Sequence, residues 1–273
     1  MFSCGEHIML SKTTHHVLLR RTHHAVGDSA SFSIFNFSEV YMFYYGYDLT
    51  YLIFVLPAML IAMWAQMNVT STFKKYSKTP SDRGLTGRDA ARRILDGAGL
   101  HHVQVVPTEG ELTDHFDPKE NVIRLSTPVY NVASAAAVGV AAHEAGHAIQ
   151  HATGYFPIKL RMAVIPVANI GSKLAMPLVI LGLILSFPPV AYAGIIFFCA
   201  AVFFQLVTLP VEFNASGRAM ALMKEGYMQG DEGLKASRKV LTAAALTYVA
   251  ALFVSLMNLL RLILIVNRSR GRR

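Results

Sequence analysis

Charged residues and cysteines are both scarce in this chain of 273 residues. Charged residues make up 15% of it, whereas an ordinary soluble domain carries about 25%, and hydrophobic residues make up 53%. We therefore expect part of the chain to lie in a lipid bilayer. The two cysteines, Cys4 and Cys199, supply neither a disulfide framework nor a CxxC metal site. Any bound metal must therefore be held by histidine and carboxylate side chains.

The excess of basic over acidic residues is the next feature. The formal net charge is +8, which can indicate a nucleic-acid partner. Here, however, basic residues flank the apolar segments, as at Lys74, Lys75 and in the tail 268–273. This placement is typical of charges that orient membrane helices. Because the sequence has no basic helix and no aromatic RNA-binding motif, it predicts contact with a lipid bilayer and no nucleic-acid partner.

Four apolar segments are candidates for membrane spans, because about 20 apolar residues cross a bilayer as a helix. They are 47–67, 174–187, 190–209 and 240–266, and the short second segment can extend back through 164–170. The polar regions between them hold most of the lysines and arginines, which places both regions in the cytosol. Four spans then put the basic tail outside, against the same rule. Either the last segment does not cross fully, or the number of spans differs by one.

The first 41 residues differ from the rest, because they are rich in histidine and serine and have no sustained apolar periodicity. Paired histidines such as His15 and His16 can bind metal, but a disordered leader or a non-native upstream extension explains the segment more simply. Met42 begins a stretch typical of a folded protein and is the expected natural start. Residues 42–273 are then expected to form a single membrane-embedded domain.

The long polar region 68–173 predicts a mixture of helix and strand. Thr86 and Asp89 form a loose capping-box pattern at the start of a helix. Two strand-like runs flank the turn residues 117–120, which predicts a β-hairpin. The alanine-rich segment 129–151 predicts a helix that ends before Gly154.

That helix contains the motif His143-Glu144-Ala-Gly-His147, which is HExxH. Residues i and i+4 lie on one helix face, so both imidazoles can reach one ion. Glu144 is offset by about 100 degrees and can face a metal-bound water without ligating the metal. This is the arrangement of zinc proteases. The alternative is a buried polar face of a structural helix, but the small residues before the motif favour the metal site.

A catalytic zinc needs a third protein ligand and an open fourth position. His151 is excluded, because it lies about 12 Å from His143 along a helix. Glu212 follows an apolar run, where a carboxylate is costly unless it has a partner, and two membrane segments return it to the side of His147. The alternative is an interfacial glutamate in a structural salt bridge. The sequence predicts one Zn²⁺ per chain, bound by His143, His147 and Glu212.

Three further residues are candidates for supporting roles. Asp114 and His115 lie in the predicted hairpin and can orient a zinc histidine, or the hairpin can pair with an extended substrate as an added strand. A purely structural hairpin is the other interpretation. Tyr248, in the last apolar segment, can donate to an oxyanion, although a core or interfacial tyrosine fits the same position. We expect 68–173 and 211–239 to form the catalytic region.

With these residues in view, the chain resembles the neutral zinc metallopeptidases of bacterial membranes over about residues 42–266. The resemblance is carried by STFKKYSK, GLTGRDAARRIL, GELTDHFDP, IRLS, GVAAHEAGHAIQHATGY, PVANIGS, QLVTLPVEFNAS and ALTYVAA. The chain is similar, more distantly, to the gluzincin membrane proteases of the prenyl-protein (CAAX) and HtpX types, which combine HExxH with a glutamate in an ExxxD pattern. Glu212 matches that ligand, but Ser216 stands at the Asp position, which leaves open what orients the zinc histidine.

The resemblance implies a mainly α membrane protein with about four transmembrane helices and a zincin-like α+β catalytic region that contains a small β-hairpin or sheet. It also implies zinc-dependent proteolysis at a bacterial cytoplasmic membrane. The predicted enzyme hydrolyses peptide bonds of proteins or peptides, membrane proteins included, through a metal-activated water, with its site on the cytosolic side.

Two alternatives stay open. A site-2-like intramembrane protease has an Asp-Gly motif downstream of HExxH, whereas the only LDG here, at 95–97, lies upstream. A non-catalytic zinc-binding scaffold would favour four protein ligands and would not need the general base Glu144. Both alternatives therefore fit the sequence less well than an interfacial zinc endopeptidase.

Overall fold

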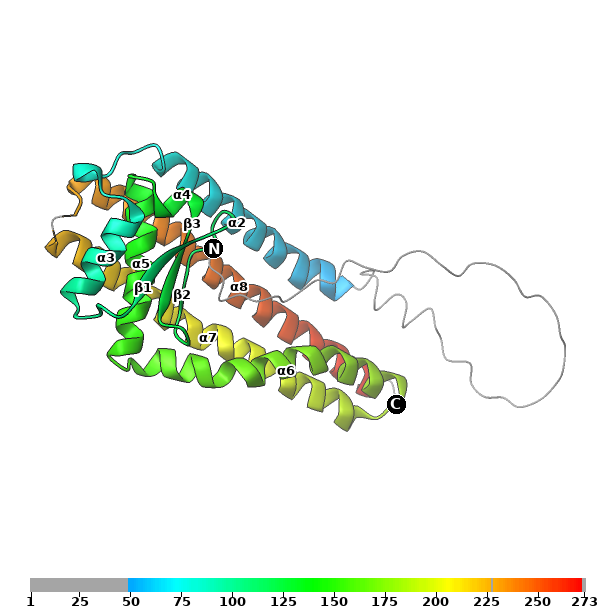
Figure 1. Cartoon of the computed structure of the whole chain (residues 1–273). Coiled ribbons are helices and arrows are strands. Elements are labelled where there is room, and N and C mark those ends of the chain that lie inside the picture. The colour runs from blue at the N-terminus through cyan, green and yellow to red at the C-terminus, as the bar shows by residue number, and fades with distance from the viewer. Residues whose placement is uncertain (1–48, 227, 272–273) are drawn as a thin grey trace, which may run out of the picture.

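The computed structural model describes residues 49–226 and 228–271. The predicted leader 1–41 and the expected start at Met42 lie outside these residues. The described chain is mainly helical. A region of mixed helix and strand lies at one end, and long helices extend from it to one side (Figure 1).

Four helices in the described part are long and apolar enough to cross a membrane. The first consists of a short π-helix, η1, followed by α2, and the others are α6, α7 and α8. Their bounds are Tyr51–Val55 for η1, Leu56–Tyr76 for α2, Phe156–Ile184 for α6, Pro188–Glu225 for α7 and Asp231–Gly271 for α8. The number of candidate spans agrees with the sequence-based prediction.

These helices pack side by side in the order α2, α8, α7, α6. The contact between α6 and α7 is the most extensive of them, because glycines let the two backbones approach. A Cβ atom at Gly194, for example, would lie 2.6 Å from the carbonyl oxygen of Ala175. Large apolar side chains such as Trp64 and Ile196 stay exposed on the outer faces. An extended apolar surface of this kind marks contact with a membrane.

The second span is longer than the predicted segment 174–187. Helix α6 has 29 residues, and most of them, 156–173, fall in the predicted polar region 68–173. Arg161, Pro166 and Pro177 interrupt the apolar pattern in the sequence. The helix nevertheless continues, because membrane helices tolerate proline and because Arg161 is buried inside the protein.

The mixed region lies between α2 and α6 in the chain. The Thr86 hydroxyl accepts a hydrogen bond from the N–H of Asp89 and completes the predicted capping box of α3. Strands β2 and β3 form the predicted antiparallel hairpin, and β1 pairs parallel with β3, so β2 is an edge strand. The bounds are Gly87–Gly97 for α3, Gln104–Thr108 for β1, His115–Asp117 for β2, Val122–Ser126 for β3, Thr127–Tyr130 for α4 and Ala135–Ala152 for α5.

Helix α5 lies at the centre of the fold. The Ser134 hydroxyl caps its start by accepting from the N–H of Ala137, and nearly all of its residues are buried. It packs against α3, α7, α8 and the sheet. A Cβ atom at Gly146 would lie 2.8 Å from the carbonyl oxygen of Ala215 on α7. Gly146 therefore sets how closely α5 and α7 cross.

We expect Gly146→Ala to destabilise the protein by about 1–3 kcal/mol, because the added methyl group meets backbone that cannot move without separating the helices. Gly217→Ala is the matched control, because no heavy atom lies within 4 Å of its Cβ position on α7. There alanine should gain up to about 1 kcal/mol through helix propensity. Thermal unfolding midpoints in detergent test both, and a Gly146→Ala midpoint at or above that of the wild type would contradict the expectation.

Candidate metal centre

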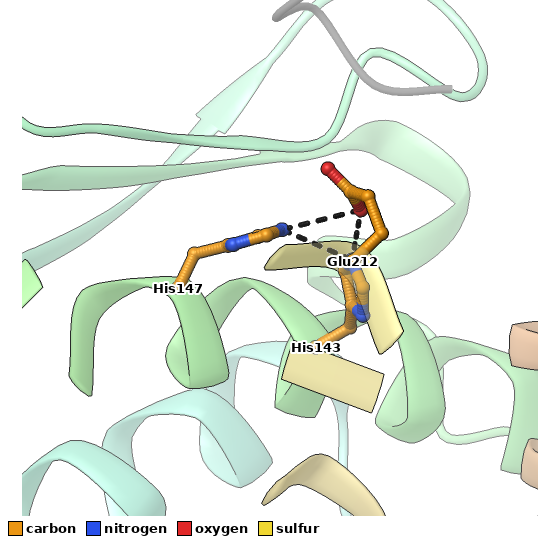
Figure 2. A group of neighbouring side chains, drawn as sticks. All are labelled: His143, His147 and Glu212. Carbon is orange, nitrogen blue, oxygen red and sulfur yellow. Dashed lines mark hydrogen bonds and ion pairs between the residues drawn. The ribbon is translucent and has the colours of Figure 1, made fainter. Parts of the chain in front are cut away.

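Three side chains from two helices meet inside the protein (Figure 2). His143 and His147 come from α5, and Glu212 comes from α7, which continues past the predicted end of the third span at 209. The two Nε2 atoms lie 3.1 Å apart. The Oε2 atom of Glu212 lies 3.2 Å from Nε2 of His143 and 3.5 Å from Nε2 of His147. The structure thus brings together the three residues that the sequence singled out as metal ligands.

The outer nitrogen of each imidazole ring is already engaged. Nδ1 of His143 lies 3.1 Å from the hydroxyl oxygen of Ser216, and Nδ1 of His147 lies 3.0 Å from Oε1 of Gln150. The Nε2 atoms are therefore directed at each other and at the Glu212 carboxylate. Three electron-pair donors that converge within 4.8 Å in a buried place fit a divalent cation, and two histidines with one carboxylate form a ligand set typical of catalytic zinc.

The other carboxylate oxygen of Glu212 is bound by Arg161. Its Nη1 atom lies 3.1 Å from Oε1 of Glu212, and both side chains are almost entirely buried. Helix α6 thus supplies a positive charge to the cluster, and Oε2 is left to face the two histidines. The sequence analysis missed Arg161. The signal that could have found it is an arginine inside an otherwise apolar segment, since such a charge needs a partner.

Glu144 follows His143 on α5 and is buried. Its carboxylate accepts a hydrogen bond from the backbone of Phe116 on the edge strand β2, and burial raises the pKa of Glu144 to about 7. The carboxylates of Asp114 and Glu212 contribute to this raised pKa, while His143 opposes it. Glu144 therefore links the three-residue cluster to the edge of the sheet.

Comparison with known proteins agrees with this geometry. A family described as "Putative neutral zinc metallopeptidase" matches residues 51–267. The chain belongs to this family. A protein of Bacillus subtilis (strain 168) named "Putative membrane protease YugP" is 48% identical over 221 residues, which cover 81% of this chain and 98% of that relative. No solved structure matches the chain.

Family membership confirms the resemblance drawn from the sequence motifs. The Bacillus relative is named as a membrane protease. This chain has, in its described part, four helices long and apolar enough to span a bilayer. The two observations agree on a membrane protein.

The remaining predicted residues of this family member lie in different places. The carboxylate of Asp114 accepts from the N–H and hydroxyl of Ser126 at 2.8–3.0 Å, and its suggested role in orienting a zinc histidine stays a prediction. It fixes the start of β2 to the end of β3, and burial raises its pKa. Nδ1 of His115 lies 2.8 Å from the carbonyl oxygen of Thr113. Tyr248 is half-buried on α8, and its role stays a prediction.

We expect Arg161→Met to destabilise the protein by about 3–5 kcal/mol, because it leaves the buried Glu212 carboxylate without its cation. Arg124→Met is the control, since Arg124 pairs with Asp117 and Glu120 where the side chains are partly exposed. Such a pair contributes only about 0–1 kcal/mol. Thermal unfolding midpoints in detergent test both variants. Equal falls of the midpoint would show that the buried Arg161–Glu212 pair stabilises the protein no more than the exposed pairs of Arg124 do.

Proposed function

We propose that this chain is a zinc-dependent membrane metalloendopeptidase that holds one Zn²⁺ with His143, His147 and Glu212. The observation that carries the proposal is the convergence of their three donor atoms beside the buried Glu144, in a member of a zinc metallopeptidase family. Zinc, when bound, supplies Lewis acidity, which lowers the pKa of coordinated water toward about 7 and polarises a carbonyl group. The chain supplies three ligands and leaves one position open.

Glu144 is the proposed general base. It accepts the proton of the attacking water and passes it to the leaving amine of the cleaved peptide bond. Its position directly after His143 in the helix brings the carboxylate beside the cluster. Arg161 keeps Glu212 in place as a ligand through its ion pair, and Ser216 holds His143. Ser216 thus takes the role of the aspartate in the ExxxD pattern, as a neutral group.

The edge strand β2 is the proposed binding place for the substrate backbone. Phe116 of this strand hydrogen-bonds Glu144, so the strand passes directly beside the general base. An extended peptide can add to such an edge as a further strand, with main-chain hydrogen bonds that do not depend on sequence. The motif helix α5 lies next to a sheet edge, which supports the proposed zincin-like catalytic region of residues 68–173 and 211–239.

We place the site at the membrane boundary. Phe213, next to Glu212, is the last large apolar side chain that is exposed along α7. Glu212 therefore lies where the lipid-facing surface ends, and a substrate must be cut at that depth. A site within the bilayer, as in site-2-like proteases, would need the apolar surface to continue well beyond Glu212.

The side of the membrane follows from charge. Lys74 and Lys75 end α2, and Lys224 lies in the last turn of α7, both near the catalytic region. Basic residues at this end support a site on the cytosolic face of a bacterial cytoplasmic membrane. Asn267, near the end of α8, accepts a hydrogen bond from Tyr192 near the start of α7. The end of α8 therefore lies on the opposite side from the site.

Zinc content of detergent-purified protein tests the metal site. We expect about one zinc per chain in the wild type, because the three-ligand set is that of catalytic zinc sites. In Glu212→Ala the content should fall sharply, since two histidines remain. Wild-type protein without zinc would overturn the proposal. Zinc retained by Glu212→Ala would remove Glu212 as the third ligand.

Glu144→Gln separates catalysis from metal binding. This variant should keep its zinc and lose about 10²–10⁴-fold in hydrolysis of a fluorogenic peptide library, because a general base contributes that much. Glu111→Gln, at an exposed position, should behave like the wild type. If Glu144→Gln kept zinc and full biological function, the protein would be a zinc-binding scaffold and not a peptidase.

A further inference from the structure

Gln150 is a buried polar side chain beside the metal centre to which the sequence analysis gave no role. It lies on α5, three residues after His147, and its residue is 0% exposed. Its Oε1 atom lies 3.0 Å from Nδ1 of His147. Its Nε2 atom donates to the carbonyl oxygen of Val211 at 2.8 Å and to Oδ1 of Asn214 at 3.0 Å, both on α7. The amide therefore uses its acceptor on α5 and both of its donors on α7.

The partners on α7 fix which way this amide points. A backbone carbonyl only accepts hydrogen bonds, so the NH₂ group must face Val211. Asn214 is fixed in turn, because Nε of Arg218 donates to its Oδ1 at 2.8 Å and a guanidinium cannot accept. Oε1 of Gln150 must then face His147, and Nδ1 of His147 must carry the hydrogen. With Nδ1 protonated, the lone pair of His147 is on Nε2, directed at the cluster.

We propose that Gln150 is the positioning residue of the metal centre: it selects the metal-binding tautomer of His147 and ties that ring to the position of α7, the helix that supplies Glu212. This inference rests on the proposed zinc site. A hydrogen-bond acceptor on the outer nitrogen of a metal-bound histidine fixes the ring, and loss of such a group typically lowers metal affinity about 10–100-fold. The acceptor here is a neutral amide, which also bridges two helices.

Because the amide has two sets of partners, its two effects can be separated. Gln150→Ala removes both the acceptor for His147 and the donors to α7. Gln150→Glu keeps an acceptor of the same shape for His147, but an ionised carboxylate cannot donate to the Val211 carbonyl. If Gln150 only stabilised the fold, zinc affinity would fall together with stability in both variants. If Gln150 positions His147, zinc affinity falls in Gln150→Ala but not in Gln150→Glu, although both variants lose stability.

Gln229 provides the matched control. It is also a buried glutamine, and its Nε2 donates to the carbonyl oxygen of Ala135 and to the Ser237 hydroxyl. It thereby joins the start of α5 to α8 and has no hydrogen bond to the cluster among those of the described residues. Gln229→Ala should lower the unfolding temperature of the protein and leave its zinc affinity unchanged.

The experiment measures two quantities on full-length protein in detergent: the dissociation constant for zinc, by competition with a chelating indicator, and the unfolding midpoint of the zinc-free form. We expect Gln150→Ala to bind zinc about 10–100-fold more weakly than the wild type. Gln150→Glu should bind zinc at least as tightly as the wild type while its midpoint falls.

Two results with the Gln150 variants would overturn the inference: Gln150→Ala with wild-type zinc affinity, or Gln150→Glu with zinc affinity as weak as that of Gln150→Ala. Both leave the proposed function standing, provided that the wild type binds zinc. If the wild type binds none, the proposed function and this inference fail together. Zinc affinity that falls in Gln229→Ala as far as in Gln150→Ala would also reject the inference, because general loosening of α5 would then explain both.

Discussion

The close crossing of α5 and α7 is the contact on which the remaining features of the centre depend. Nε2 of His143 and Oε2 of Glu212 lie 3.2 Å apart although 69 residues separate them in the chain. The side chains of two neighbouring helices meet in this way only if the helices cross closely, and Gly146 against Ala215 permits that. The small residues of α5 contribute little apolar area of their own, so tight packing against several neighbours must compensate. Because these residues are small, α5 and α7 pack closely enough for the donor atoms of His143, His147 and Glu212 to reach one ion.

Burial of polar groups in an apolar setting is the second constraint. An uncompensated charge or amide there costs on the order of several kcal/mol, so the Glu212 carboxylate, the two imidazoles and the Gln150 amide all have partners. Arg161 balances Glu212, and Gln150 satisfies His147, Val211 and Asn214 together. Such hydrogen-bonded networks restrict a site to one arrangement. The hydrogen bonds of Gln150 and Ser216 and the ion pair of Arg161 therefore hold the donor atoms in place.

What the sequence predicted well is what local geometry determines. The relation of His143 to His147 follows from the pitch of one helix, the capping box lies within four residues, and the side on which Glu212 returns follows from counting spans. Arg161 and Gln150 were missed, because Glu212 lies 51 residues from Arg161, and Val211, which accepts from the Gln150 amide, lies 61 residues from Gln150. No periodicity marks such a contact between helices. The bond of Asp114 to Ser126 was missed for the same reason, since it depends on how β2 and β3 are joined. The start of α6 at Phe156 was missed because Arg161 interrupts the apolar pattern, although its side chain is buried in the fold.

The origin of the ligands also has a consequence for the biogenesis of the protein. The two histidines lie on α5, which comes before α6 and α7 in the chain, whereas Glu212 and Arg161 both arrive with the α6–α7 hairpin. Until that hairpin packs beside α5, the histidines lack their carboxylate and the carboxylate lacks its cation. The order of the elements along the chain therefore means that the ligand set is completed only by a late packing step, after both α6 and α7 have been made.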